Sequence, residues 1–344
     1  MSSVSLIPRR LLRVAALAGA AAVVLSACSS SSDEKDDDSK ASGEGTFPVT
    51  IEHAYGTTEI TEEPTRIVTL GLSDQDPLLA LGVAPIAVSP WYGDYEYATW
   101  PWAQDELGDA TPVVLNDGVR DEANPPVEEI ASLDPDLIIS LYNGTTEEQY
   151  EQLSRIAPVV VPDEEYTDFS ITWQEATRAT GEALGREDDA LALVDELEDA
   201  FADAAAEHPE FEGQEVAVGE RFEPGETVLR TGNDVRARFF EQLGFTIPEE
   251  IAGITPDEYG ELIVPDELIT EISKDLLVWN VGFAPEEKTT IEGLPLYSQL
   301  PVVDEDKVLW IEDEVVSGAF SWGTVLSLEY ALEELLPQID QVAG

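Results

Sequence analysis

Two segments of the chain concentrate side chains that could hold a bulky, oxygen-rich ligand. Six of its 7 Trp and 10 Tyr residues lie between Trp91 and Trp102, and four of its 17 Lys and Arg residues lie close together: Arg221, Arg230, Arg236 and Arg238. Aromatic rings can form a wall against a large ligand, and guanidinium groups donate charge-assisted hydrogen bonds to carboxylate, catecholate or hydroxamate oxygens. Two structural alternatives stay open: the rings pack on one another, and the arginines pair with surface acids.

The composition of the chain excludes several classes of protein. Its 344 residues include 72 Asp and Glu against 17 Lys and Arg, a net charge of −55. This charge excludes a general nucleic-acid binder and docking on anionic lipid through surface charge. The single cysteine excludes a disulfide scaffold. The two histidines, His53 and His208, disfavour a His-built metal centre or a serine hydrolase. The acid-rich, lysine-poor surface also suggests a salt-adapted host, because salt screens self-repulsion.

The amino-terminal segment is typical of a bacterial export signal. Residues 1–27 combine three arginines with a short apolar run. The end of that run, Leu25-Ser26-Ala27-Cys28, resembles a lipobox, the motif in which the cysteine is lipidated after cleavage. Residues 28–47 lack apolar periodicity and predict a solvated linker. We therefore expect a protein that is anchored through a lipid on Cys28 at the extracytoplasmic face of the cell membrane.

The rest of the chain alternates short apolar runs with helical stretches. Strands are predicted at 66–70, 85–89, 112–115, 136–140 and 158–161, and a second series at 215–220, 227–230, 275–280 and 308–312. Such alternation predicts βαβ units and parallel sheets. Between the two series, apolar residues recur at helical spacing: Ala190, Val194, Leu197, Phe201 and Ala205. The sequence thus predicts an α/β fold with lobes at 48–167 and 211–344, joined by a helical connector at 168–210.

The cleft between two such lobes is the expected ligand site, because ligands bind beyond the carboxyl ends of parallel strands. The candidates for ligand contacts lie at or after the ends of predicted strands, at the start of a predicted helix, or before the final helix: Trp91, Tyr92, Tyr142, Arg221, Arg236, Trp279, Phe283 and Trp322. Arg236 and Arg238 would lie on opposite faces of a helix, so at most one of them is expected to point inward. His53 and His208 are expected to have structural roles only.

Three motifs, in order, resemble the iron-siderophore (and cobalamin) substrate-binding proteins of ABC importers. They are His53–Thr58 followed by Glu63–Val68, Leu78–Pro85 and Val127–Ile138. The resemblance covers nearly all of the chain after the linker. It implies two Rossmann-like lobes joined by a single long helix. It also implies a monomeric, non-enzymatic protein without a cofactor or direct metal ligand, which captures a ferric-siderophore, an Fe(III) chelate, and delivers it to an ABC permease dimer with its ATPase.

The same resemblance implies that one glutamate on each lobe docks on permease arginines. The matching positions are Glu128 and, in a more divergent motif, Glu267. Other interpretations remain open. Haem or cobalamin could replace the siderophore on the same fold, and the tyrosines of the aromatic loop could supply an axial haem ligand. Two other classes also remain open. A surface adhesin would bind no small ligand, and an extracellular hydrolase would need a nucleophile paired with a base.

Overall fold

The computed structural model describes residues 45–119, 121, 124–166, 168–232, 234–251, 253–257 and 260–344. The predicted signal peptide, Cys28 and nearly all of the predicted linker lie outside these residues. Within the described part of the chain, no helix is both long enough and apolar enough to cross a bilayer.

The first lobe contains a fully parallel sheet, as predicted. Its strand order is β5-β4-β3-β6-β7. The strands are β3 (Ile67–Thr69), β4 (Ala87–Val88), β5 (Val113–Val114), β6 (Leu137–Ile139) and β7 (Val159–Val160). A separate antiparallel hairpin precedes them, formed by β1 (Val49–His53) and β2 (Gly56–Ile60). The helices of this lobe are α1 (Gln75–Ala80), η1 (Glu96–Ala98), η2 (Pro101–Ala103), α2 (Gln104–Leu107), η3 (Asn116–Gly118), α3 (Val127–Ser132) and α4 (Glu147–Leu153).

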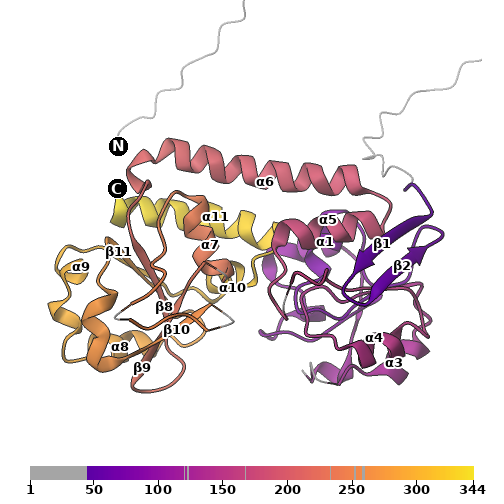
Figure 1. The fold of residues 1–344 in the computed structure, drawn as a ribbon, viewed down its shortest axis with the longest axis horizontal. Helices are drawn as coiled ribbons and strands as arrows, with labels where there is room; N and C mark the ends of the chain where they lie inside the picture. Colours follow the sequence, from indigo (N-terminus) through magenta and orange to yellow (C-terminus); the bar gives the residue numbers. More distant parts are fainter. Residues whose placement is uncertain are drawn as a thin grey trace, which may run out of the picture. The chain divides into compact units, whose positions relative to one another are not determined.

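The chain then crosses to the second lobe through two helices, α5 (Trp173–Ala183) and α6 (Glu187–Glu207). Helix α6 is the long helix that runs across the top of Figure 1, beside α11 (Val325–Ala343). Its first turn carries three acids, which suit the positive end of the helix dipole. Its buried face consists of residues at helical spacing: Ala190, Val194, Leu197, Phe201 and Ala204. The amphipathic spacing therefore predicted both the helix and the face that it buries.

The second lobe contains a mixed sheet, which corrects the prediction of a parallel one. Its order is β10-β9-β8-β11-β12. The strands are β8 (Val216–Glu220), β9 (Glu226–Arg230), β10 (Glu261–Pro265), β11 (Leu276–Asn280) and β12 (Val308–Ile311). Strands β8, β11 and β12 are parallel, but β9 is antiparallel to β8 and to β10. The reason is the short loop at 221–225, since only an antiparallel pair can be joined so closely.

The sequence predicts no strand at 261–265, where β10 lies, and its apolar pattern predicts an ordinary helix at 265–272. Residues 266–272 instead form the 3₁₀ helix η5 (Asp266–Ile272). The other helices of the second lobe are η4 (Pro209–Phe211), α7 (Val235–Gln242), α8 (Glu287–Glu292), η6 (Tyr297–Gln299), α9 (Pro301–Asp304), α10 (Glu314–Trp322) and the C-terminal helix α11.

The two lobes also contact each other away from α6. Trp100 of the first lobe is 1% exposed, and a Cβ atom added at Gly318 of α10 would lie 2.5 Å from its Cζ3 atom. The side chain of Asp76 on α1 accepts a hydrogen bond of 2.6 Å from Oγ1 of Thr324, the residue that caps α11. The two lobes therefore also meet through Trp100 and α1 on one side and α10 and the start of α11 on the other. The predicted architecture of two lobes and one long helix is confirmed.

Candidate ligand-binding site

An aromatic cavity of about 360 Å³ lies between the two lobes. Trp91 and Tyr92 follow β4 and Tyr142 follows β6, so all three lie beyond the carboxyl ends of parallel strands. From the second lobe, Arg236 of α7 and Trp322 at the end of α10 complete the lining. The structure therefore brings five of the predicted site residues into one cavity.

The rings of this cavity contact one another across the lobes. The centroid of Trp322 lies 4.7 Å from that of Trp91 and 6.0 Å from that of Tyr92. Phe283 stacks on the other side of Trp322, at 5.7 Å and an interplanar angle of 20°. Tyr92 and Phe283 are 50% and 46% exposed. The aromatic loop therefore both packs on itself and lines the cavity. Trp100 packs inside the protein, whereas Trp91 and Tyr92 face the cavity.

A second cavity of about 570 Å³ adjoins the first and shares Tyr142, Phe169 and Arg236 with it. We call the two cavities together the cleft. The second cavity is lined by seven charged residues: Glu165, Asp168, Arg230, Asp234, Arg236, Arg238 and Glu261. Both Arg236 and Arg238 belong to this lining, so the expectation that at most one would point inward is wrong. The cavity lies at the beginning of α7, where side chains from both faces of the first turn can reach it.

Beneath the cleft, the buried carboxylate of Glu220 organises the arginines. It accepts hydrogen bonds from Nε of Arg230 and Nη1 of Arg236, both at 2.8 Å, and from Nδ2 of Asn280 at 2.7 Å. Glu220 ends β8 and Asn280 ends β11, so neighbouring parallel strands present both groups at one edge of the sheet. The sequence analysis missed both residues.

Asp234 caps α7 and binds the Arg236 guanidinium on its other side. Its Oδ1 accepts from Nε of Arg236 at 2.8 Å, and its Oδ2 accepts from Nη2 at 2.6 Å. Burial by itself would raise the pKa of the Asp234 carboxyl, but the neighbouring Arg236 and Arg230 charges outweigh burial and hold the pKa below its usual value. Arg236 is therefore fixed in place by two carboxylates, those of Asp234 and Glu220.

Three predicted ligand residues are not part of the cleft lining. Phe283 stacks on Trp322 beside the cavity, whereas Trp279 and Arg221 are buried away from it. Trp279 is 0% exposed and lies in the core of the second lobe beside Tyr297 and Trp310. Arg221, with a side chain 2% exposed, donates to Asp266 Oδ1 at 2.7 Å and to Thr227 Oγ1 at 3.1 Å. The predictions for Trp279 and Arg221 are wrong.

The physical reason is the same at both positions, since successive side chains of an extended chain point to opposite sides. Glu220 and Asn280 face the arginines of the cleft, so their neighbours Arg221 and Trp279 point away from it. Polar residues that end otherwise apolar strands were the signal that could have identified Glu220 and Asn280.

The two glutamates that resemble permease contacts are exposed residues outside the cleft lining. Glu128 lies on α3 and Glu267 in η5. Glu267 was expected on a helix equivalent to that of Glu128, but η5 is a 3₁₀ helix, which eclipses side chains three residues apart.

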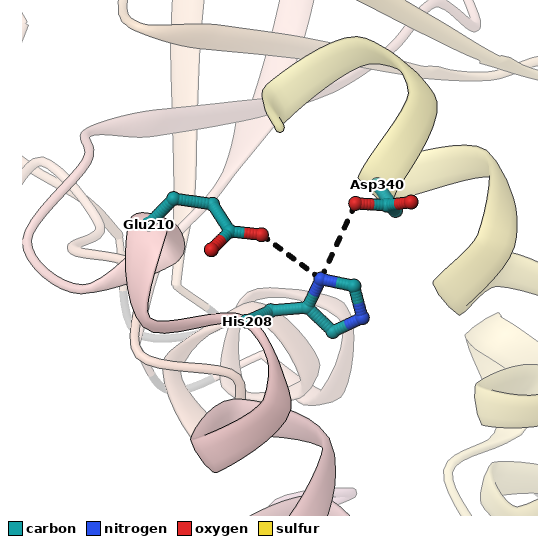
Figure 2. A group of neighbouring side chains, drawn as sticks. All are labelled: His208, Glu210 and Asp340. Atoms are coloured by element: carbon teal, nitrogen blue, oxygen red, sulfur yellow. Dashed lines mark hydrogen bonds and ion pairs between the residues drawn. The ribbon is translucent and has the colours of Figure 1, made fainter.

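The two histidines have partners that explain their positions. The Nε2 atom of His53 lies 2.9 Å from Oγ1 of Thr58. His208 stacks on Phe211. Its Nδ1 atom lies 3.0 Å from Glu210 Oε1 and 3.3 Å from Asp340 Oδ1. Figure 2 shows how the two carboxylates approach this nitrogen. One hydrogen bond between Nδ1 and Glu210, and the pairing of the same nitrogen with Asp340, account for this group, which links the end of α6 to α11. We assign no metal to it.

Comparisons with known proteins agree with the two-lobed fold and its cleft. Residues 67–315 match the family model described as "Periplasmic binding protein". The chain is 32% identical over 298 residues to "Probable siderophore-binding lipoprotein YfiY" of Bacillus subtilis strain 168, covering 83% of this chain and 86% of that protein. It is 29% identical over 217 residues to "Fe(3+) dicitrate-binding periplasmic protein FecB" of Escherichia coli strain K12, covering 62% of this chain and 67% of that one.

Among solved structures, a periplasmic solute-binding protein from Mycobacterium smegmatis aligns with a TM-score of 0.77 at 30% identity. The alignment covers 86% of this chain and 99% of that one. The family is one of solute-binding proteins, so the prediction of a binding protein rather than an enzyme is confirmed. The chain belongs to the periplasmic binding protein family, as a relative of the iron-siderophore substrate-binding proteins of ABC importers.

Proposed function

We propose that this protein captures a ferric-siderophore in the cleft between its lobes and delivers it to the permease of an ABC importer. One observation carries the proposal: Trp91, Tyr92 and Tyr142 of the first lobe line the same cavity as Arg236 and Trp322 of the second. Aromatic faces can cover the apolar surface of a chelate, while a fixed guanidinium donates hydrogen bonds to its oxygens. The names of the relatives YfiY and FecB support an iron chelate as the ligand.

Haem is the weaker candidate for the same cleft. Its iron would take an axial ligand such as a tyrosinate, and Tyr142 is a half-buried tyrosine of the cavity. Burial and the charge of Asp234 raise the pKa of the Tyr142 hydroxyl, with the cleft arginines opposing them. A raised pKa makes the phenolate form of Tyr142, which would bind iron, harder to reach.

The proposal extends to the location and partners of the protein. After export, a lipid on Cys28 would anchor the chain at the outer face of the cell membrane, with the segment to residue 47 as a tether. The importer would consist of a permease dimer and its ATPase. Glu128 and Glu267 would pair with permease arginines, since both carboxylates are exposed on different lobes.

Tryptophan fluorescence tests the ligand directly, because Trp91 and Trp322 line the cavity. We expect saturable quenching by at least one ferric-siderophore, and none by haem or cobalamin. Arg236→Ala is expected to weaken binding by about 10- to 100-fold, as for a lost charged hydrogen bond. Trp322→Ala tests the other side of the cavity without exposing Glu220. Arg178→Ala, on α5 outside the cleft, is the matched control and should bind like the unmodified protein. Failure of all ferric chelates to bind would refute the proposal.

Separate variants test delivery and anchoring. The double variant Glu128→Ala, Glu267→Ala should bind the chelate normally but abolish uptake by cells. Unchanged uptake would exclude the docking role. Cys28→Ala should release the protein from the membrane fraction, and retention would exclude the lipid anchor.

A further inference from the structure

The arginines that face the cleft are largely neutralised by the protein itself. Arg230 pairs with Glu220 and Glu261, and its guanidinium also lies 3.7 Å from Asp234. Arg236 pairs with Glu220 at 2.8 Å and with Asp234 at 2.6 Å. Each of these guanidiniums therefore contacts at least two carboxylates. The local excess of positive charge in the sequence is cancelled by acids from β8, β10 and the cap of α7.

The described residues that line the second cavity carry no net positive charge. The second cavity is lined by three arginines and four acids, Glu165, Asp168, Asp234 and Glu261, and the carboxylate of Glu220 lies beneath them. A site that binds a multiply charged anion needs cations that remain unpaired in the protein, because a paired guanidinium has already given its charge, and most of its donors, to carboxylates. Among the described residues, Arg238 alone of the three has no ion pair within 4.0 Å.

The electrostatic field of the whole protein also disfavours anionic ligands. A chain with a net charge of −55 repels anions at long range, which slows their approach and raises the free energy of a bound anion. The effect is largest at low ionic strength and weakens as salt shortens the Debye length.

We propose that the cleft selects a ferric chelate of little or no net negative charge, the hydroxamate class, over multiply anionic catecholate and carboxylate chelates. This inference rests on the proposed function. Three hydroxamates cancel the charge of Fe(III), whereas three catecholates leave a net charge of minus three. Arg238 and the outer N–H of Arg236 can each donate to a hydroxamate oxygen. The rings of Trp91, Tyr92 and Trp322 can cover the aliphatic arms that link the hydroxamates.

The test is a fluorescence titration with chelates that differ in charge. The probes are ferrichrome, a neutral tris-hydroxamate; ferrioxamine B, a cationic one; a ferric tris-catecholate; and ferric dicitrate. At low salt, we expect the hydroxamates to bind at least about 10-fold more tightly than either anionic chelate, and the ratio should shrink in about 1 M NaCl. Tighter binding of the tris-catecholate or of ferric dicitrate would overturn the inference and leave the proposed function intact. Failure of all four chelates would refute the proposed function instead.

A charge variant separates electrostatics from shape. Glu261→Gln removes one lining carboxylate with almost no change in size, and its side chain is 30% exposed, so the fold should tolerate it. We expect this variant to bind the anionic chelates about 3-fold or more tightly relative to ferrichrome. Asp195→Asn on α6 removes the same charge outside the cleft and should leave the ratio unchanged. An equal change in both variants would show that charge within the cleft does not set the preference.

Discussion

The buried carboxylate of Asp76 accepts two hydrogen bonds, which would suggest that it stabilises the fold. We predict instead that its ionised form destabilises the protein. Asp76 is 2% exposed, and its Oδ2 accepts from Nε1 of Trp102 at 2.9 Å and from Oγ1 of Thr324 at 2.6 Å. Burial raises the pKa of this carboxyl from 3.8 to about 6, although the two hydrogen bonds oppose the rise. No arginine or lysine of the described residues compensates the charge, so the folded protein favours the protonated form.

The size of the effect follows from this pKa. The difference between 3.8 and about 6 corresponds to about 3 kcal/mol, at about 1.4 kcal/mol per pKa unit. Because the pKa is higher in the folded state, this stability is fully present below about pH 4 and is lost as the pH rises through about 6. Asp76→Asn is neutral at every pH, and its Oδ1 can accept both hydrogen bonds. We therefore expect the variant to match the unmodified protein near pH 4 and to exceed it by about 2–3 kcal/mol at pH 8.

Urea unfolding between pH 4 and pH 8 measures this difference. Asp105→Asn, an exposed position on α2, is the control for the loss of one negative charge from a very acidic protein. Its effect should be small and nearly independent of pH. An Asp76→Asn variant that is less stable than the unmodified protein at pH 8 would refute the reasoning, because the ionised carboxylate would then be a net contributor to stability.

Three further predictions concern packing, the core and charge. Gly318→Ala should lower the free energy of unfolding by about 1–3 kcal/mol, because its Cβ would lie 2.5 Å from Trp100; an unchanged stability would show that the interface between the lobes can shift freely. Trp279→Phe should lower the free energy of unfolding by about 2 kcal/mol without changing chelate affinity, since this side chain is buried in the core. A loss of chelate affinity at unchanged stability would show that Trp279 contacts the ligand. The melting temperature should rise with NaCl, because 72 acids face 17 bases, and a flat or falling dependence would contradict a salt-adapted surface.

The site was predictable where it depended on local features. Aromatic residues that follow β4 and β6 had to lie beyond the carboxyl ends of parallel strands, so Trp91, Tyr92 and Tyr142 were found from the strand pattern. Spacing at 3.6 residues per turn predicted α6 and its buried face. These features depend on neighbours in the sequence, which makes them visible without the fold.

Pairing between distant segments was not predictable in this way. The sequence showed four arginines in an acidic chain, but the pairing of Arg230 and Arg236 with Glu220 and Glu261 depends on β8, β9 and β10 lying side by side. The direction of Arg221 depended on the end of β8, where a difference of one residue moves a side chain to the other face of the sheet.

The sequence by itself determined the α/β class, the two lobes, the long helix and the family, because periodicity and motif order are properties of the chain. The tertiary structure alone decided which charges remain available to a ligand. Electrostatic compensation depends on distance in space, and the carboxylates that neutralise the cleft come from elements that are far apart in the sequence.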